Sequence, residues 1–190
     1  MTRSTIALLL IMPLACFAHV TFGPHTAMQG FLHPLTGMDH LLAMFAVGWL
    51  AVQGRGRPGT ALVPMAFLAG MLGGFGFGAA GFNAHFAEYG IVLSIVAMGG
   101  IVAFSIESKF LWALTLAAGL CHGLVHGAEM PTNSSTAEYL LGILASSGAL
   151  LFLGMQAYRH CSKTVAFTTI RLAVSATLIF AGIRFLLDLA

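Results

Sequence analysis

Residues 60–82 read TALVPMAFLAGMLGGFGFGAAGF and contain no charged side chain. The run matches the roughly 20 apolar residues that a helix needs to cross a bilayer, where backbone groups without water must pair within the helix. Small residues recur every four positions in it, at Ala66, Gly70, Gly74 and Gly78. Such residues share one helix face and let a neighbouring helix approach closely. The stretch predicts a closely packed membrane helix, with the lining of a narrow path as the alternative role for its glycines.

The whole chain has the same apolar character. Of its 190 residues 58% are hydrophobic and only 7% charged, and the mean hydropathy is +0.93. Soluble domains average about 25% charged residues. We therefore expect an all-α polytopic membrane protein with six transmembrane helices. The predicted spans are Pro34–Gln53, Thr60–Phe82, Tyr89–Ser105, Phe110–His126, Ala137–Tyr158 and Ala166–Leu187. The net charge of +2 and the lack of a basic patch give no indication of a nucleic-acid partner.

The N-terminus is expected to be a cleavable signal peptide over residues 1–18, which leaves 19–190 as the six-helix membrane domain. A basic start is followed by the apolar run Ile6–Leu14 and by a small residue, Ala18, at the cleavage point. Retention of this segment and acylation of Cys16 are the alternatives.

Basic residues predict the orientation. The loops Gly54–Gly59, Ile106–Lys109 and Arg159–Val165 contain Lys or Arg, whereas the segments predicted on the other side have only Arg184, near the end of the last span. Cytoplasmic loops are enriched in Lys and Arg. We therefore expect an inner-membrane protein with its mature N-terminus and C-terminus in the periplasm.

Histidines follow the opposite distribution. On this topology His160 is cytoplasmic. The outer side or the outer part of a span receives His19, His25, His33, His40, His85, His122 and His126. Ionisable groups within spans are costly and indicate a functional site, although a single membrane histidine also serves as a hydrogen-bond partner between helices.

The first polar cluster is the segment from His33 to His40. A helix that begins at Pro34 would place His33, Gly37, His40 and Met44 along one stripe. Asp39 would point about 100° away from His40, so it would either ligate after local adjustment or orient an imidazole from behind.

The second cluster follows the fourth predicted span. His122 and His126 lie four residues apart on one helix face, and Glu129 would join them if the helix continued. Two imidazoles and a carboxylate suit a borderline divalent metal such as nickel, cobalt or zinc. We expect one metal site shared by both clusters, made of His33, Asp39, His40, His122, His126 and Glu129. Additional metal-capture positions are His19, His25, Met44, His85 and Glu88.

These two motifs resemble signatures of the HupE/UreJ family of bacterial membrane proteins, which are associated with hydrogenase and urease systems. Residues 33–44 are similar to the family pattern HPxxGxDHxxAM, and residues 122–131 to HGxxHGxExP. A looser similarity links the chain to nickel–cobalt permeases with an HxxxxDH motif, but here five residues separate His33 from Asp39. The resemblance covers essentially the whole chain.

The resemblance implies that the chain imports Ni²⁺ from the periplasm, with Co²⁺ or Zn²⁺ as alternatives, for hydrogenase or urease maturation. It also implies contact with a downstream nickel chaperone or maturation protein, and it leaves a homo-oligomer open. A nickel-binding assembly factor or sensor that moves no metal would carry the same ligands. A membrane metalloenzyme is the remote alternative, and neither an HExxH nor a GxSxG motif occurs, so we expect no enzymatic activity.

Overall fold

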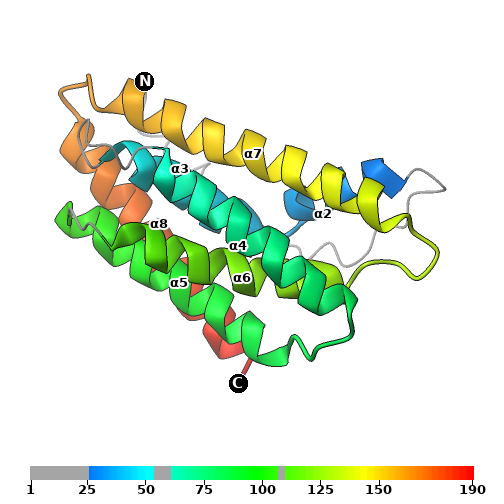
Figure 1. Cartoon of the computed structure of the whole chain (residues 1–190). Helices are drawn as coiled ribbons and strands as arrows, with labels where there is room; N and C mark the ends of the chain where they lie inside the picture. Colours follow the sequence, from blue (N-terminus) through cyan, green and yellow to red (C-terminus); the bar gives the residue numbers. More distant parts are fainter. Residues whose placement is uncertain (1–25, 54–60, 107–109) are drawn as a thin grey trace.

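A computed structural model describes residues 26–53, 61–106 and 110–190, and within them every regular element is an α-helix (Figure 1). The helices are α2 (Thr26–Thr36), α3 (Met38–Gln53), α4 (Leu62–Ala79), α5 (His85–Phe104), α6 (Leu111–Ala128), α7 (Thr136–Cys161) and α8 (Phe167–Asp188). The five helices α4 to α8 are each long and apolar enough to cross a membrane. The predicted class, an all-α polytopic membrane protein, is confirmed. The predicted signal peptide, His19, His25 and the loop Gly54–Gly59 lie outside the described residues.

The first predicted span is not one straight helix. It is the pair α2 and α3, bent by 82° at Gly37, so the prediction of a single helix that begins at Pro34 is wrong. Pro34 lies inside α2, where its ring disturbs the helix and removes a donor. The Thr36 hydroxyl then donates to the His33 carbonyl at 2.9 Å, and α3 opens with a new bond from Leu41 N–H to the Gly37 carbonyl.

The third predicted span also begins earlier than expected. Helix α5 starts at His85, four residues before Tyr89, because the Asn83 side chain accepts the His85 N–H at 2.8 Å and satisfies an early helical donor. His85 and Glu88, which the predicted span Tyr89–Ser105 leaves outside the helix, therefore lie in its first turn, and the predicted start at Tyr89 is wrong.

Backbone packing joins α4 to α6 through glycines on both helices. A Cβ on Gly70, Gly74 or Gly78 of α4 would meet the carbonyl of Leu116, Leu120 or Leu124 of α6. In return, Gly119, Gly123 and Gly127 of α6 lie against the carbonyls of Phe67, Met71 and Phe75 of α4. The two helices thus run in the same direction with their backbones in contact. We call these six glycines the α4–α6 seam.

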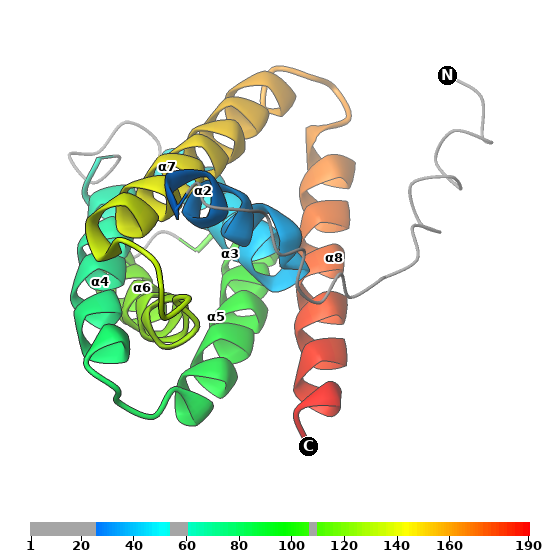
Figure 2. The same cartoon turned by 90° about the vertical axis from the view of Figure 1, so that its right-hand side faces the viewer.

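The other helices also pack against one another, α2 and α3 against α7, and α5 against α8 (Figure 2). Helices α2 and α3 lie along α7: Gly30 contacts the Tyr139 carbonyl, and Gly48 contacts that of Leu151. Helix α8 packs against α5 in the opposite direction, and the Tyr89 hydroxyl near the start of α5 donates to the Leu189 carbonyl after α8. These directions bring the starts of α3, α5 and α7 and the ends of α4, α6 and α8 to the same side of the protein.

Candidate metal centre

Four histidines from three helices converge at that side of the protein. His33 comes from the last turn of α2, His40 from the first turn of α3, and His122 and His126 from the last two turns of α6. The His40 ring centre is 4.5 Å from that of His126, 5.3 Å from that of His122 and 6.0 Å from that of His33. The α4–α6 seam includes Gly123 and Gly127, each directly after one of these histidines, so the packing of α4 sets where the α6 imidazoles lie.

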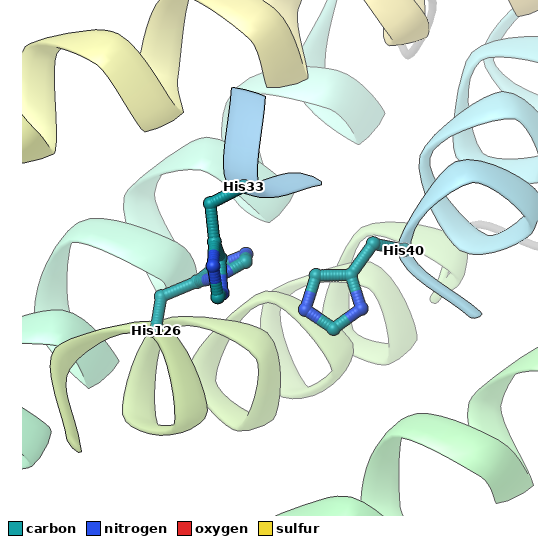
Figure 3. A group of neighbouring side chains, drawn as sticks. All are labelled: His33, His40 and His126. Atoms are coloured by element: carbon teal, nitrogen blue, oxygen red, sulfur yellow. The ribbon is translucent and has the colours of Figure 1, made fainter. Parts of the chain in front are cut away.

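Three of the rings form a compact group. One nitrogen each from His33, His40 and His126 can be chosen so that all three lie within 4.8 Å of one another. Figure 3 shows these three side chains pointing toward one another from three separate helices. We call them the histidine trio. Their spacing is that of ligands around one metal ion, and imidazoles suit Ni²⁺, Zn²⁺ and Cu²⁺.

Two carboxylates complete the cluster. Asp39 Oδ1 lies 2.9 Å from His40 Nδ1, which is the placement that a carboxylate orienting this imidazole from behind would need. Glu129 Oε2 lies 3.1 Å from His33 Nε2, just beyond the end of α6. The hydrogen bond from His33 holds the pKa of Glu129 below its usual value, although partial burial acts in the opposite direction. Glu129 therefore remains an anion at the mouth of the cluster.

Several imidazole nitrogens in the cluster are buried without a hydrogen-bond partner. Within the described part of the chain, neither nitrogen of His126 has one, and the same is true of His122 Nε2. The other nitrogen of His122, Nδ1, lies 2.9 Å from the Ala118 carbonyl. A buried polar group without a partner costs about 1–3 kcal/mol. A bound cation would remove part of that cost, because each neutral imidazole offers it the lone pair of one nitrogen.

Exposure decreases along the cluster. The side chain of Glu129 is 47% exposed, that of His33 27% and that of His40 9%, whereas His122 and His126 are fully buried. Glu129 and the four histidines therefore form a graded series from the protein surface into the helix bundle, and Asp39, 32% exposed, lies beside His40.

Aromatic rings border the cluster. The Tyr139 ring of α7 is 6.1 Å from that of His33, and the Phe67 ring of α4 is 5.4 Å from that of His122. Both aromatic residues are buried. The sequence did not single them out, since one aromatic residue in an apolar span carries no signal of its own. The i, i+4 repeat Phe67, Met71 and Phe75, which shares a face of α4, is the only pattern that could have suggested this border.

The remaining predicted positions lie apart from the trio or outside the described residues. Met44 is fully buried in the apolar core one helical turn below His40. His85 contacts the rings of Phe86 and Tyr89 at the start of α5, with Glu88 in the same turn. The structure thus brings together all six residues that were expected to share one site, but not the additional capture positions that it describes.

The sequence of this chain is similar to those of a known protein family. The family model of the HupE / UreJ protein matches residues 6–185. Protein HupE of Rhizobium leguminosarum bv. viciae is 36% identical over 149 residues, which cover 77% of this chain and 77% of that protein. No solved structure matches the chain. The chain belongs to the HupE/UreJ family.

Proposed function

We propose that this chain is a permease that carries Ni²⁺ from the periplasm across the bacterial inner membrane. The observation that carries the proposal is the graded cluster, in which the half-exposed carboxylate of Glu129 at the mouth leads to imidazoles that are fully buried between membrane helices. Burying ionisable groups in this way lowers the stability of the protein, so their presence indicates a function. Ionisable groups in membrane spans mark ion pathways.

The choice of ion follows from the donors and from the family. Imidazole ligands, which form most of the cluster, favour borderline divalent metals over Mg²⁺ or Ca²⁺. The chain belongs to the HupE/UreJ family, whose resemblance to hydrogenase and urease accessory proteins implies nickel as the ion. Nickel is therefore the proposed cargo, with cobalt and zinc as competing ions. We propose that the imported nickel is used for the maturation of hydrogenase or urease.

The orientation rests on charge. Arg159, Lys163 and Arg171 lie at the end of α7 and the start of α8, on the side of the protein opposite to the histidine cluster. Cytoplasmic segments are rich in such residues, so the mouth at Glu129 faces the periplasm in the proposed topology, as does the C-terminus.

Transport would begin with capture at Glu129 and His33. The ion would then exchange water for the imidazoles of the histidine trio, which bind metal only in their deprotonated form. The sequence contains no P-loop motif. The driving force is therefore proposed to be an ion gradient, the membrane potential or trapping in the cytoplasm.

A protein that binds nickel without moving it is the second candidate, and the same cluster supports it because its ligands would be identical. The two candidates differ only in whether metal crosses the membrane.

The test is uptake of radioactive nickel by cells that express the chain. The double variant His40→Ala/His126→Ala removes two members of the trio, and His160→Ala removes an exposed histidine at the end of α7, away from the cluster. We expect saturable uptake by the unchanged chain and by His160→Ala, and none by the double variant at equal membrane abundance. Uptake by the unchanged chain no higher than in empty cells would exclude a permease, and nickel binding by the purified protein would then favour an assembly factor or sensor.

A further inference from the structure

His122 is set apart from the other three histidines. It lies one helical turn before His126 on α6, farther from the exposed mouth at Glu129, and it is not a member of the histidine trio. Its ring contacts that of His40 on one side and that of Phe67 on the other. Among the described residues, His40 is the member of the trio whose ring contacts that of His122.

The hydrogen bonding of His122 determines which of its nitrogens can bind a metal. A carbonyl oxygen can only accept a hydrogen bond, so the 2.9 Å contact with the Ala118 carbonyl requires the proton to be on Nδ1. The lone pair of the neutral ring is then on Nε2, which is fully buried and has no partner among the described residues. His122 is therefore held in the tautomer and orientation of a metal ligand.

His40 is placed to serve both positions. Its Nδ1 is next to the Asp39 carboxylate, which leaves Nε2 as the nitrogen free of that contact. The ring lies 4.5 Å from the ring of His126 and 5.3 Å from that of His122, measured between centres. A change in its side-chain torsion angles would move the free nitrogen from one neighbour toward the other.

We propose that His122 and His40 form a second, inner metal site, which receives the ion from the histidine trio through the shared ligand His40. This inference rests on the proposed function, because it describes successive positions of a transported ion. The trio with Glu129 is the entry site, and the pair of His40 and His122 is the next position inward.

The ligands of the inner site favour release. They are the imidazoles of His40 and His122, both of which are buried. These donors are uncharged, in contrast to Glu129 at the entry. A site with fewer charged ligands holds a divalent ion less tightly, and conduction needs sites that are weak enough to leave.

The experiment separates binding from movement. Nickel affinity of the purified chain is measured by titration calorimetry, and nickel uptake is measured in proteoliposomes that contain the same preparation. The variants are His126→Asn in the trio, His122→Asn and His122→Gln at the inner site, and Cys121→Ala as a matched change in the same turn of α6. Elution as one symmetric peak in detergent is the folding criterion for each variant.

We expect His126→Asn to lose nickel affinity by at least about tenfold, as the loss of a metal ligand should. We expect both His122 variants to keep the affinity of the unchanged chain within about threefold while uptake falls by at least about tenfold. Cys121→Ala should retain both properties.

Two results would exclude the proposed inner site and leave the proposed permease function intact. An equal loss of affinity in the His122 and His126 variants would show one shared site, and unchanged uptake in a folded His122 variant would show a structural histidine. If the unchanged chain itself moves no nickel, the permease proposal fails and the relay fails with it. Failure of both His122 variants to fold, with Cys121→Ala intact, would also count against the relay, since it would make His122 a packing residue.

Discussion

The α4–α6 seam leads to the sharpest prediction about this structure, because one added methyl group should disturb both stability and the site. A Cβ on Gly74 would lie 2.8 Å from Leu124 N and closer still to the Leu120 carbonyl oxygen, whereas ordinary contacts are 3.4–4 Å. Both neighbours are backbone atoms of α6, so no side chain can move aside. In Gly74→Ala the two helices must therefore separate locally by roughly 1 Å, and overpacking of this kind costs about 1–3 kcal/mol.

The same displacement should weaken metal binding. Helix α6 carries His122 and His126, and Gly74 faces Leu120 and Leu124 of α6, on either side of these histidines' neighbour Gly123. A ligand misplaced by about 1 Å can reduce function by about 100-fold. We expect Gly74→Ala to lower the unfolding midpoint in detergent and to weaken nickel binding by at least about tenfold. Gly123→Ala, whose Cβ would lie 2.7 Å from Phe75 N, should behave alike.

The same helix offers two matched controls. A Cβ on Gly76 would meet nothing within 4 Å, and one on Gly73 would meet only the end of the Leu120 side chain, at 3.6 Å. Alanine is preferred over glycine in a helix by about 1 kcal/mol, so Gly76→Ala and Gly73→Ala should be neutral or slightly stabilising and should bind nickel normally. If Gly74→Ala unfolds at the same midpoint as Gly76→Ala, the helices are not in backbone contact and the reasoning is refuted.

Three further predictions concern single groups. Asp39→Asn keeps the shape of the side chain but removes the charge behind His40. Calorimetry should show that nickel affinity is reduced by about 10- to 100-fold. An unchanged affinity would mean that the carboxylate does not support the ring. Nickel affinity should also weaken on acidification, because imidazoles bind metal only when they are deprotonated. Glu129, whose pKa is lowered by His33, should stay ionised and contribute little to this loss. Titrations of the unchanged chain and of Glu129→Gln at neutral and at mildly acidic pH check this, since a smaller loss in Glu129→Gln would contradict it. Gln53→Leu removes the buried acceptor of the Trp49 indole N–H, which lies 3.1 Å away. The variant should be destabilised by about 1–3 kcal/mol in a detergent unfolding assay, while its nickel affinity stays normal. A normal unfolding midpoint would show that the indole finds another partner.

Much of the fold could be predicted from hydropathy, because lipid requires long apolar helices and charges must lie at their ends. Helices occupy all six predicted spans. The break between α2 and α3 could not be predicted in this way, since Pro34 suits the first turn of a helix as well as a kink inside one. Only the tertiary contacts of α2 with α7 decide between the two.

The membership of the cluster could be predicted from sequence, whereas its internal order could not. Histidine spacing on α6 and the segment from His33 to His40 indicated which residues meet. The separation of His122 from the trio depends on how α3 lies against α6, and no spacing within either helix contains that information. The aromatic border from Tyr139 and Phe67 depends in the same way on packing between helices.

The bend at Gly37 is itself part of the cluster. Along a straight α-helix, residues seven apart such as His33 and His40 are separated by about 10 Å, too far for both imidazoles to reach one ion. The 82° bend between α2 and α3 brings their ring centres to 6.0 Å and also places His33 next to Glu129. A Cβ on Gly37 would lie 2.8 Å from Asp39 Oδ1 and 3.2 Å from His40 Nδ1, so a glycine here keeps open the space in which the carboxylate supports the ring. Gly37, at which the helix is interrupted, and the residues that would bind the ion therefore depend on one another for their positions.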